Sequence, residues 1–380
     1  MYAFMTLLGL IGTIGFIRGF VFRERRYVVM FSLAEAAMLY THNWALFYGA
    51  AALVSLVILY LISGPEIREN LIKDAVYAYV GAANLFAPWV PTFIFQAIHT
   101  AAPWDTAPRF GAPVQIALNV YGGASVAMLS VIAGGLGYAR LFTKAERNTT
   151  PAKVGLMLIC LVILTLAFGW WASQVTPAWN PRYFAPIIAP LMMLTAIGMS
   201  RAGMIGAIAM LFILIFLCRP GAFETKYKSD MQDIGGEMGG LLHKGDLVIV
   251  GQPEETALAY YYLPGGLKWA NTIGPVADPT YMNWNNAMSR YLHATPSKVL
   301  PPMINALKPG QQLLYIRSLT EGTAGWKAQW TSEVRLRAAQ WGAIIQHYQA
   351  DGQLTQERWA PHNYRGACCV ANSAVLYKKA

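Results

Sequence analysis

The sequence predicts a polytopic α-helical membrane protein with about eight spans, followed by a soluble α/β domain outside the membrane. Two observations lead to this fold class. Hydrophobic residues make up 56% of the 380 residues and charged residues only 13%, and the apolar residues come in long blocks that end at Cys218. A helix needs about 20 apolar residues to cross the hydrocarbon core. We therefore divide the chain into a membrane domain, 1–218, and a soluble domain, 219–380.

Apolar blocks near the length of a span follow one another through the membrane domain. They cover residues 1–22, 27–41, 43–62, 74–97, 113–137, 154–173, 183–200 and 203–218. In the first block, Gly12, Gly15 and Gly19 have the spacing that lets membrane helices approach closely. We expect the first helix to pack tightly on a neighbour through these glycines.

Loop charge predicts the orientation, because Lys and Arg are retained on the cytoplasmic side of a membrane. One set of loops is basic: it holds Arg23, Arg25, Arg26, Arg68, Lys73, Arg140, Lys144, Arg147, Lys153 and Arg201. The alternate loops, 40–44, 99–113 and 174–184, hold little beyond Arg109 and Arg182. These loops, the N-terminus and the soluble domain are then exterior, which in a bacterial inner membrane means periplasmic. The net charge of +10 is partly this topology signal and does not indicate nucleic acid.

The soluble domain alternates helical and strand-like patterns, which favours an α/β layer fold with a largely parallel sheet. Its expected helices are 229–242, 253–263 and 326–349, and its expected strands are 246–251, 311–318 and 368–377. It contains no Gly-rich dinucleotide fingerprint and no P-loop, so no cofactor is assigned.

The four cysteines indicate no metal site, because no metal-ligand spacing is present. Cys160 and Cys218 lie in or beside apolar spans, where a thiol behaves as a small hydrophobic group. Cys368 and Cys369 are adjacent in the exterior domain. We interpret them as two strand residues that face opposite sides, with a strained vicinal disulfide as the alternative.

The exterior loops carry a chemistry that the basic loops lack. They offer Tyr40 and His42 at one break between spans, Trp89 at the end of another span, and Asp105 with Arg109 in the 99–113 loop. Together these residues could line one exterior cleft, although each aromatic alone fits the interfacial belt.

Arg182 and Tyr183 open a late span beside three prolines, Pro181, Pro186 and Pro190. These prolines should break regular helix, and irregular backbone at this depth is tolerated where it lines a cavity. A fixed guanidinium at a cavity mouth suits phosphate recognition. Arg182, Tyr183 and Arg109 are therefore the candidate ligands of a lipid phosphate.

Glu35 is the only acidic residue well inside a predicted span, one to two helical turns below Tyr40 and His42. An intramembrane carboxyl group marks a candidate functional site. We add Glu35 to the residues that could line the cleft, with a hydrogen bond to a neighbouring helix as the structural alternative.

Three segments carry a resemblance to a known superfamily: "LYTHN" followed by "ALFYGAAALVSLVIL", then "LFAPWVPTFIFQ", then "PRYFAPIIAPLMML". In this order they resemble the later half of the GT-C type membrane glycosyltransferases, which include protein O-mannosyltransferases and the lipid A aminoarabinose transferase. The resemblance implies a polyprenyl-phosphate sugar as donor, a membrane lipid environment and transfer on the exterior face. Arg182 with Tyr183 matches that family's arginine–tyrosine pair at a late span, and Tyr40 with His42 matches its tyrosine–histidine element.

The sequence departs from this family in one respect. The family's catalytic carboxylate lies in an early exterior loop, before the region that the resemblance covers, so we expect a separate or missing N-terminal catalytic segment. Asp105 is the only carboxylate in the exterior membrane loops and a poor substitute by position, and nothing in the sequence suggests a raised pKa there. It is the catalytic candidate that the chain itself offers.

Two other function classes stay open. A proton-coupled transporter or lipid flippase would use Glu35 as its gate, but it predicts inverted internal repeats, and the sequence shows none. A non-catalytic assembly subunit would bind lipid phosphate without turnover.

Overall fold

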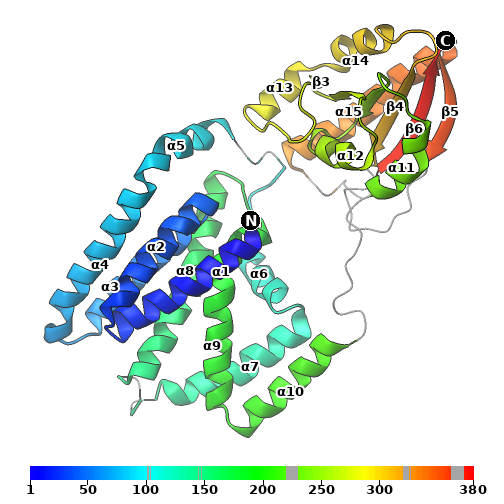
Figure 1. Cartoon of the computed structure of the whole chain (residues 1–380). Coiled ribbons are helices and arrows are strands. Elements are labelled where there is room, and N and C mark those ends of the chain that lie inside the picture. The colour runs from blue at the N-terminus through cyan, green and yellow to red at the C-terminus, as the bar shows by residue number, and fades with distance from the viewer. Residues whose placement is uncertain are drawn as a thin grey trace. The chain divides into compact units, whose positions relative to one another are not determined.

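The computed structural model describes the chain apart from residues 101, 103, 144, 147, 220–229, 320–324, 326 and 361–371. It divides into two compact units (Figure 1). The membrane unit comprises Met1–Ala97 and Ala107–Phe223, and the α/β unit comprises Ile98–Thr106 and Glu224–Ala380. The sequence predicts an exterior membrane loop over 99–113. The segment Ile98–Thr106 belongs instead to the α/β unit.

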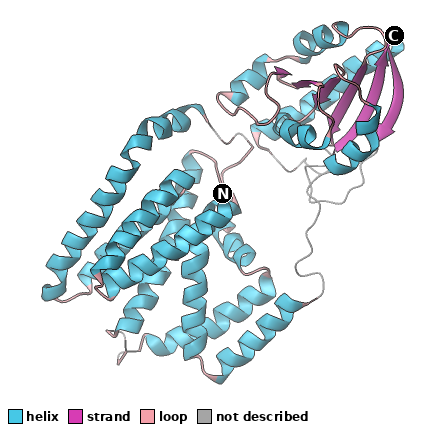
Figure 2. Ribbon diagram, viewed as in Figure 1, coloured by secondary structure: helices cyan, strands magenta, loops and turns pink. Residues whose placement is uncertain are grey.

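The membrane unit is helical throughout its described residues (Figure 2). Its elements are α1 (Tyr2–Phe16) with a π-helical turn (Ile17–Val21), α2 (Arg25–Thr41), α3 (Ala45–Leu61), α4 (Pro65–Phe86), the 3-10 turn η2 (Ala87–Trp89), α5 (Val90–His99, whose last two residues belong to the α/β unit), α6 (Ala112–Val120), α7 (Ala124–Leu141), α8 (Thr150–Val175), the 3-10 turn η3 (Pro181–Ile187), α9 (Ile188–Arg201) and α10 (Met204–Cys218).

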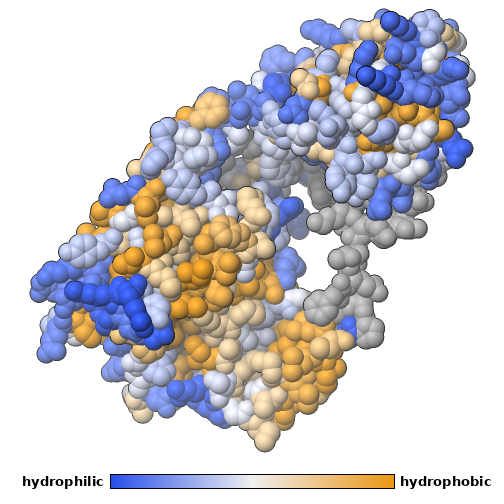
Figure 3. All heavy atoms as spheres, in the orientation of Figure 1, coloured by the Kyte–Doolittle hydropathy of each residue, from blue (hydrophilic) through white to orange (hydrophobic). Residues whose placement is uncertain are grey.

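Five helical stretches among the described residues are long and apolar enough to cross a membrane. They are Tyr2–Val21, Pro65–His99, Ala124–Leu141, Thr150–Val175 and Pro181–Arg201. Helices α3 and α10 are apolar but shorter. Hydrophobic side chains gather over the helices of this unit, as Figure 3 shows. By length and composition these helices are compatible with a multi-pass membrane protein, and a total of about eight spans stays a prediction.

The span predicted at 113–137 has the wrong bounds, because the helix breaks within it and the stretch long enough to cross is Ala124–Leu141. Gly122 and Gly123 have φ values of +78° and +137°, a conformation that glycine adopts readily and other residues avoid. The chain therefore forms two helices, α6 and α7, and α6 with 9 residues is too short to cross a membrane.

Helix α1 packs tightly on α2, as the glycine spacing predicted. A β-carbon at Gly15 would lie 2.8 Å from the backbone nitrogen of Phe31, and one at Gly19 would lie 2.9 Å from that of Val28. At Gly12 the nearest atom would be 3.3 Å away, so this glycine is less tightly enclosed. Gly15 of α1 and Gly19 of the following π-helical turn therefore leave no room for a β-carbon beside α2.

A buried ion pair joins α4 to the connection between α1 and α2. Asp74 is 3% exposed. It accepts a 2.7 Å hydrogen bond from Arg23 and lies 3.4 Å from the Nε of Arg25. A buried carboxylate needs such partners, so these basic residues, interpreted above only as a topology signal, also hold α4 in place.

The α/β unit contains a six-stranded sheet in the order β3-β2-β1-β4-β6-β5. Its strands are β1 (Leu247–Val250), β2 (Lys268–Asn271), β3 (Gly274–Val276), β4 (Gln312–Ser318), β5 (Leu354–Ala360) and β6 (Asn372–Lys379). Only β1 with β2 and β1 with β4 pair in parallel, whereas β3, β5 and β6 pair antiparallel with their neighbours. The expected α/β class is confirmed, but the expectation of a largely parallel sheet is wrong.

Helices cover both faces of this sheet because its central strands alternate their side chains. Val248 and Val250 pack into one core with α11 (Met231–Met238) and α12 (Thr256–Tyr262). Leu247 and Ile249 pack into another with α14 (Pro296–Asn305) and α15 (Gln329–Ala350). Successive residues of a strand point to opposite faces, so a run that is apolar at every position requires a core on each side.

The remaining elements of the α/β unit are short. They are α13 (Ala287–His293) and the 3-10 turns Gly239–Leu241 and Pro253–Glu255. The sequence patterns located β1, β4, α12 and α15 to within a few residues, and they missed β2, β3, β5, α13 and α14. Cys368 and Cys369 lie outside the described residues.

Candidate functional site

Arg182 stands at the start of the turn η3, with its side chain exposed and held on two sides. The side-chain oxygen of Asn180 accepts hydrogen bonds from the Arg182 backbone nitrogen, at 3.3 Å, and from its Nε, at 3.1 Å. The guanidinium carbon lies 5.8 Å from the centre of the Tyr2 ring, within the range of a cation–π contact. The guanidinium is thus oriented and still accessible to a ligand.

Irregular backbone follows Arg182, as its prolines predicted. Pro181 begins the 3-10 turn, Pro186 lies within it, and Phe184 has non-helical dihedral angles. Pro190 causes no break, because it lies in the first turn of α9, where a backbone N–H has no helical partner.

Residues Phe184–Ile187 of this turn are buried. Irregular backbone is tolerated at membrane depth where it lines a cavity, as the sequence suggested, or where it is buried in protein. This turn meets the second condition.

Close packing on α1 positions this turn. A β-carbon at Gly9 would lie 2.7 Å from the Cα and 2.8 Å from the carbonyl oxygen of Pro186. Gly9 and Tyr2 are seven residues apart on α1, about two helical turns, so they share one face of the helix. The same face therefore receives the turn at Gly9 and the guanidinium of Arg182 at Tyr2.

Three further rings surround Tyr183. Its ring centre lies 4.7 Å from that of His42, 5.1 Å from that of Trp44 and 6.3 Å from that of Tyr2. We call Tyr2, His42, Trp44, Arg182 and Tyr183 the Arg182 cluster. It joins α1, the connection between α2 and α3, and the turn η3 into one aromatic surface with a single cation.

His42 is a neutral hydrogen-bonding group in this cluster. Burial lowers the pKa of His42, so the ring is uncharged at neutral pH. Its Nδ1 accepts a hydrogen bond of 3.2 Å from the backbone nitrogen of Trp44. In the neutral ring the hydrogen then resides on Nε2, which is a donor.

Tyr40 and Trp89 form a second cluster with Phe86. The Tyr40 ring centre lies 5.6 Å from that of Phe86 and 5.8 Å from that of Trp89. The Tyr40 hydroxyl donates a 2.9 Å hydrogen bond to the carbonyl oxygen of Leu85. These contacts tie the end of α2 to α4 and give Tyr40 and Trp89 a packing role.

Glu35 is buried within the membrane unit, with 3% of its surface exposed. Its Oε1 packs on Gly49 of α3, where a β-carbon would collide with it. Its Oε2 has no hydrogen-bond partner among the described residues. Beside it, the Tyr79 hydroxyl donates a 2.7 Å hydrogen bond to the carbonyl oxygen of Gly49. Glu35 lies between helices, and no contact described here links it to the Arg182 cluster.

Arg109 and Asp105 separate between the two units. The carbonyl oxygen of Arg109 accepts a 3.2 Å hydrogen bond from the indole of Trp170 on α8. Asp105 belongs to the α/β unit, where the neighbouring Trp104 ring lies 4.5 Å from that of Trp284. Burial raises the pKa of Asp105 to about 6, a shift that no local pattern around this residue predicts.

Sequence reasoning missed three members of this site. Trp44 and Asn180 stand beside the residues that it selected, within "YTHNW" and "WNPRYF", and an Asn directly before a proline is a recognisable turn signal. Tyr2 carries no such signal, because only the packing of α1 at Gly9 brings it to Arg182.

Two adjacent carboxyl groups follow β1 in the α/β unit: Glu254, which is partly exposed, and Glu255, which is buried. Glu254 accepts hydrogen bonds from the indole of Trp330, at 3.0 and 3.1 Å, and from Gln252, at 2.9 Å. Glu255 accepts one from the side chain of Asn372. Burial raises the pKa of Glu255 to about 8, and the negative charges of Glu254 and Asp230 act in the same direction.

The raised pKa of Glu255 predicts that the α/β unit loses stability as pH rises. Between the unfolded value near 4.5 and the folded value of about 8, the folded state binds the extra proton. This stabilisation is complete below the lower value and lost as pH rises through the upper one. We expect amide-exchange protection of β1 and β4 in the full chain, corrected for intrinsic rates, to fall between pH 6 and 9.

Glu255→Gln should flatten this pH profile, because the amide keeps an oxygen for Asn372 and cannot ionise. Glu237→Gln on the exposed face of α11 is the matched control and should leave the profile unchanged. A profile that is equally steep in Glu255→Gln would contradict the assignment.

The comparisons with known proteins add no relative. No protein-family model matches the chain, and no curated protein or solved structure is significantly similar to it.

Proposed function

We propose that the chain belongs to an integral-membrane glycosyltransferase that takes its sugar from a polyprenyl-phosphate donor. The Arg182 cluster would hold the lipid phosphate. One observation carries the proposal: an exposed guanidinium, oriented by Asn180 and Tyr2, stands beside aromatic rings where an apolar helix begins. A lipid-linked phosphate needs this combination of a fixed cation for its oxygens and apolar surface for its chain.

The chemistry gives each group a role. In glycosyl transfer the bond between the anomeric carbon and the phosphate oxygen breaks, and a bond to an acceptor oxygen forms. Negative charge grows on the departing phosphate, where Arg182 would stabilise it. The Nε2–H of neutral His42 supplies a second donor on the same surface. The acceptor's proton must pass to a base, which the separate catalytic segment implied by the resemblance would supply. Asp105 is the candidate that the chain itself offers, and with a pKa of about 6 it is ionised at neutral pH.

The resemblance to GT-C enzymes supports the same reading of Arg182 with Tyr183 and of His42. It supports a binding role less for Tyr40 and Trp89, because these residues contact each other, Phe86 and Leu85. Arg109 would be a secondary phosphate contact, since no side-chain partner orients it among the described residues.

A transfer assay with a labelled polyprenyl-phosphate sugar tests the proposal. In proteoliposomes with an extract of periplasmic acceptors, the wild-type chain should bind the donor, and it should move the label once the separate N-terminal catalytic segment that the resemblance implies is supplied. We expect Arg182→Ala to lower transfer at least about tenfold, the effect of losing one charge-assisted phosphate contact.

The other outcomes separate the alternatives. Binding of the donor without transfer under every condition would favour an assembly subunit over an enzyme. Transfer lost in Glu35→Gln, with donor binding intact and Arg182→Ala without effect, would favour proton coupling through Glu35. Absence of both binding and transfer would refute the proposal.

A further inference from the structure

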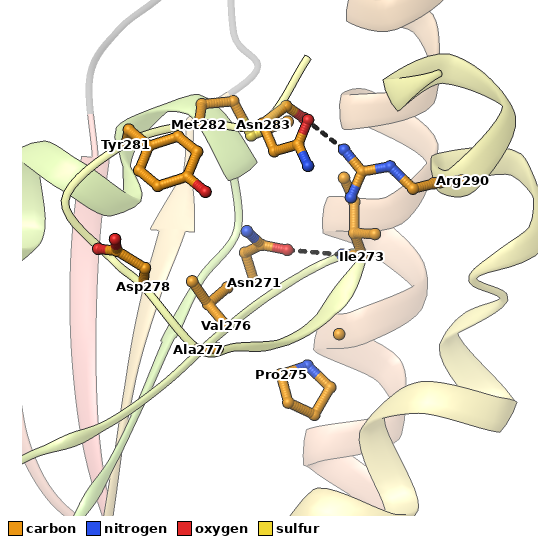
Figure 4. A pocket seen from close by; sticks show the side chains of 11 residues that line it. Asn271, Ile273, Pro275, Val276, Ala277, Asp278, Tyr281, Met282, Asn283 and Arg290 are labelled. Atoms are coloured by element: carbon orange, nitrogen blue, oxygen red, sulfur yellow. Dashed lines mark hydrogen bonds between the residues drawn. The ribbon is translucent and has the colours of Figure 1, made fainter. Parts of the chain in front are cut away.

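A cavity lined in part by polar groups lies in the α/β unit, at the end of β2. Strand β2 ends at Asn271, the chain turns into β3, and the loop 277–286 leads into α13. These segments enclose a cavity of about 220 Å³ (Figure 4). Pockets for drug-sized ligands measure roughly 300–1,000 Å³, so this volume fits a smaller ligand of about one ring.

Arg290 closes this cavity from α13. Its Nε donates a 3.1 Å hydrogen bond to the carbonyl oxygen of Asn285, and its Nη2 donates to that of Asn283. Both contacts are with backbone, so they orient the guanidinium without neutralising its charge. Its Nη1 has no hydrogen-bond partner among the described residues and stays available to a ligand.

Donor groups from other elements face the same space. In Figure 4 the Tyr281 hydroxyl and the Asn271 amide point towards the region that Arg290 and Asn283 border. The Asn271 oxygen is occupied, because it accepts a 2.9 Å hydrogen bond from the backbone nitrogen of Ile273. Its amide nitrogen makes only a long 3.4 Å contact, with the Thr256 hydroxyl. The buried Asn271 therefore presents N–H groups to the cavity.

The one carboxylate of the lining is engaged elsewhere. Asp278 accepts hydrogen bonds from the backbone nitrogen of Thr280, at 2.9 Å, and from its hydroxyl, at 2.5 Å. These bonds lower the pKa of Asp278, and Figure 4 shows its carboxyl group turned away from Arg290. The cavity thus offers mainly donors, which suit a ligand rich in oxygen acceptors.

Aromatic packing holds the loop in place. The Trp284 ring centre lies 4.5 Å from that of Trp104 and 5.2 Å from that of Trp330. The backbone nitrogen of Asn286 donates a 2.9 Å hydrogen bond to the carbonyl oxygen of His99. A loop anchored from two other segments is pre-organised, so little ordering entropy is lost when a ligand binds.

We propose that this cavity binds a single sugar residue. Tyr281 is 58% exposed, and its ring gives an apolar surface for the C–H face of a sugar ring. Arg290, Asn271, Asn283 and the Tyr281 hydroxyl supply the donors that hydroxyl oxygens require. If the membrane unit transfers sugars, the bound residue would be part of a glycan acceptor. The role as an acceptor site rests on the proposed function, whereas sugar binding itself does not.

Ligand-observed NMR on the full chain in detergent tests the proposal with a defined panel of neutral hexoses, N-acetylhexosamines and hexuronates. We expect at least one sugar to bind, and Tyr281→Ala and Arg290→Lys each to weaken it at least about tenfold. Arg290→Lys keeps the charge but loses the fork that spans two carbonyls. Tyr281→Ala changes an exposed side chain and leaves the fold intact. Tyr261→Ala, at an exposed tyrosine of α12 outside the cavity, is the matched control and should bind as wild type does.

Three results would overturn the proposal: no sugar of the panel binds, binding is unchanged in Tyr281→Ala and Arg290→Lys, or inorganic phosphate binds with the same dependence on both residues. The third result would identify an anion site. Sugar binding and polyprenyl-phosphate binding are measured in separate experiments, so a failure here is distinguishable from a failure of the membrane site.

Discussion

Arg182→Ala should weaken binding of a polyprenyl phosphate by about 10- to 150-fold, which corresponds to about 1.5–3 kcal/mol for a lost charge-assisted contact. The reason is geometric: Asn180 and Tyr2 already orient the guanidinium, so little of its binding energy is spent on ordering the side chain. Retention of a radiolabelled polyprenyl phosphate by the purified chain in lipid nanodiscs measures the effect.

Two variants control this experiment. Arg109→Ala should cost much less, because no described side chain orients Arg109. Arg182→Lys should fall between wild type and Arg182→Ala, since a lysine restores the charge without the planar fork. Equal and small losses in Arg182→Ala and Arg109→Ala would mean that both arginines only contact lipid headgroups, and the assignment of the site would be withdrawn.

Gly9→Val should weaken the same binding as much as Arg182→Ala does, although it changes no residue of the Arg182 cluster. The added side chain would meet the backbone of Pro186 at under 3 Å, so the turn η3 must shift away from α1. Overpacking of this kind costs about 1–3 kcal/mol in stability. We expect lipid-phosphate binding to fall to the level of Arg182→Ala, because the shift separates Arg182 from Tyr2.

Gly135→Val on α7 is the matched control, because no atom lies within 4 Å of a β-carbon built there. It should retain wild-type binding and thermal stability. A change in the fluorescence of Trp44, which lies 5.1 Å from Tyr183, would report the movement of the turn in Gly9→Val; Trp44→Phe in the same background identifies that signal. Full binding in Gly9→Val would show that the contact with α1 does not position the site.

The sequence by itself determined those helices, strands and turns that depend on the pattern of residues close together in the chain. Apolar blocks predicted the membrane helices, and the apolar runs of β1 and β4 predicted the sheet core, because burial requires those patterns wherever the chain goes. Pro181 and Pro186 predicted the irregular turn after Arg182, since a proline constrains its own backbone and removes a donor. Gly122 and Gly123 carried a signal of the same kind, a break in the fifth block, that an apolar count alone overlooks.

Tertiary structure alone decided which of these residues meet. Tyr40 and His42 are two residues apart, yet one contacts Phe86 and Trp89 and the other contacts Tyr183. No pattern around Asp105 suggested a raised pKa, yet the residue belongs to the α/β unit and burial raises its pKa.

The Tyr2 ring contacts Arg182 only because Gly9, which has no β-carbon, lets the backbone of Pro186 pack against α1. A side chain's partners depend on how whole helices approach one another, and that approach is set by small residues and shape at distant positions. No local pattern around Tyr2 or Arg182 contains this information.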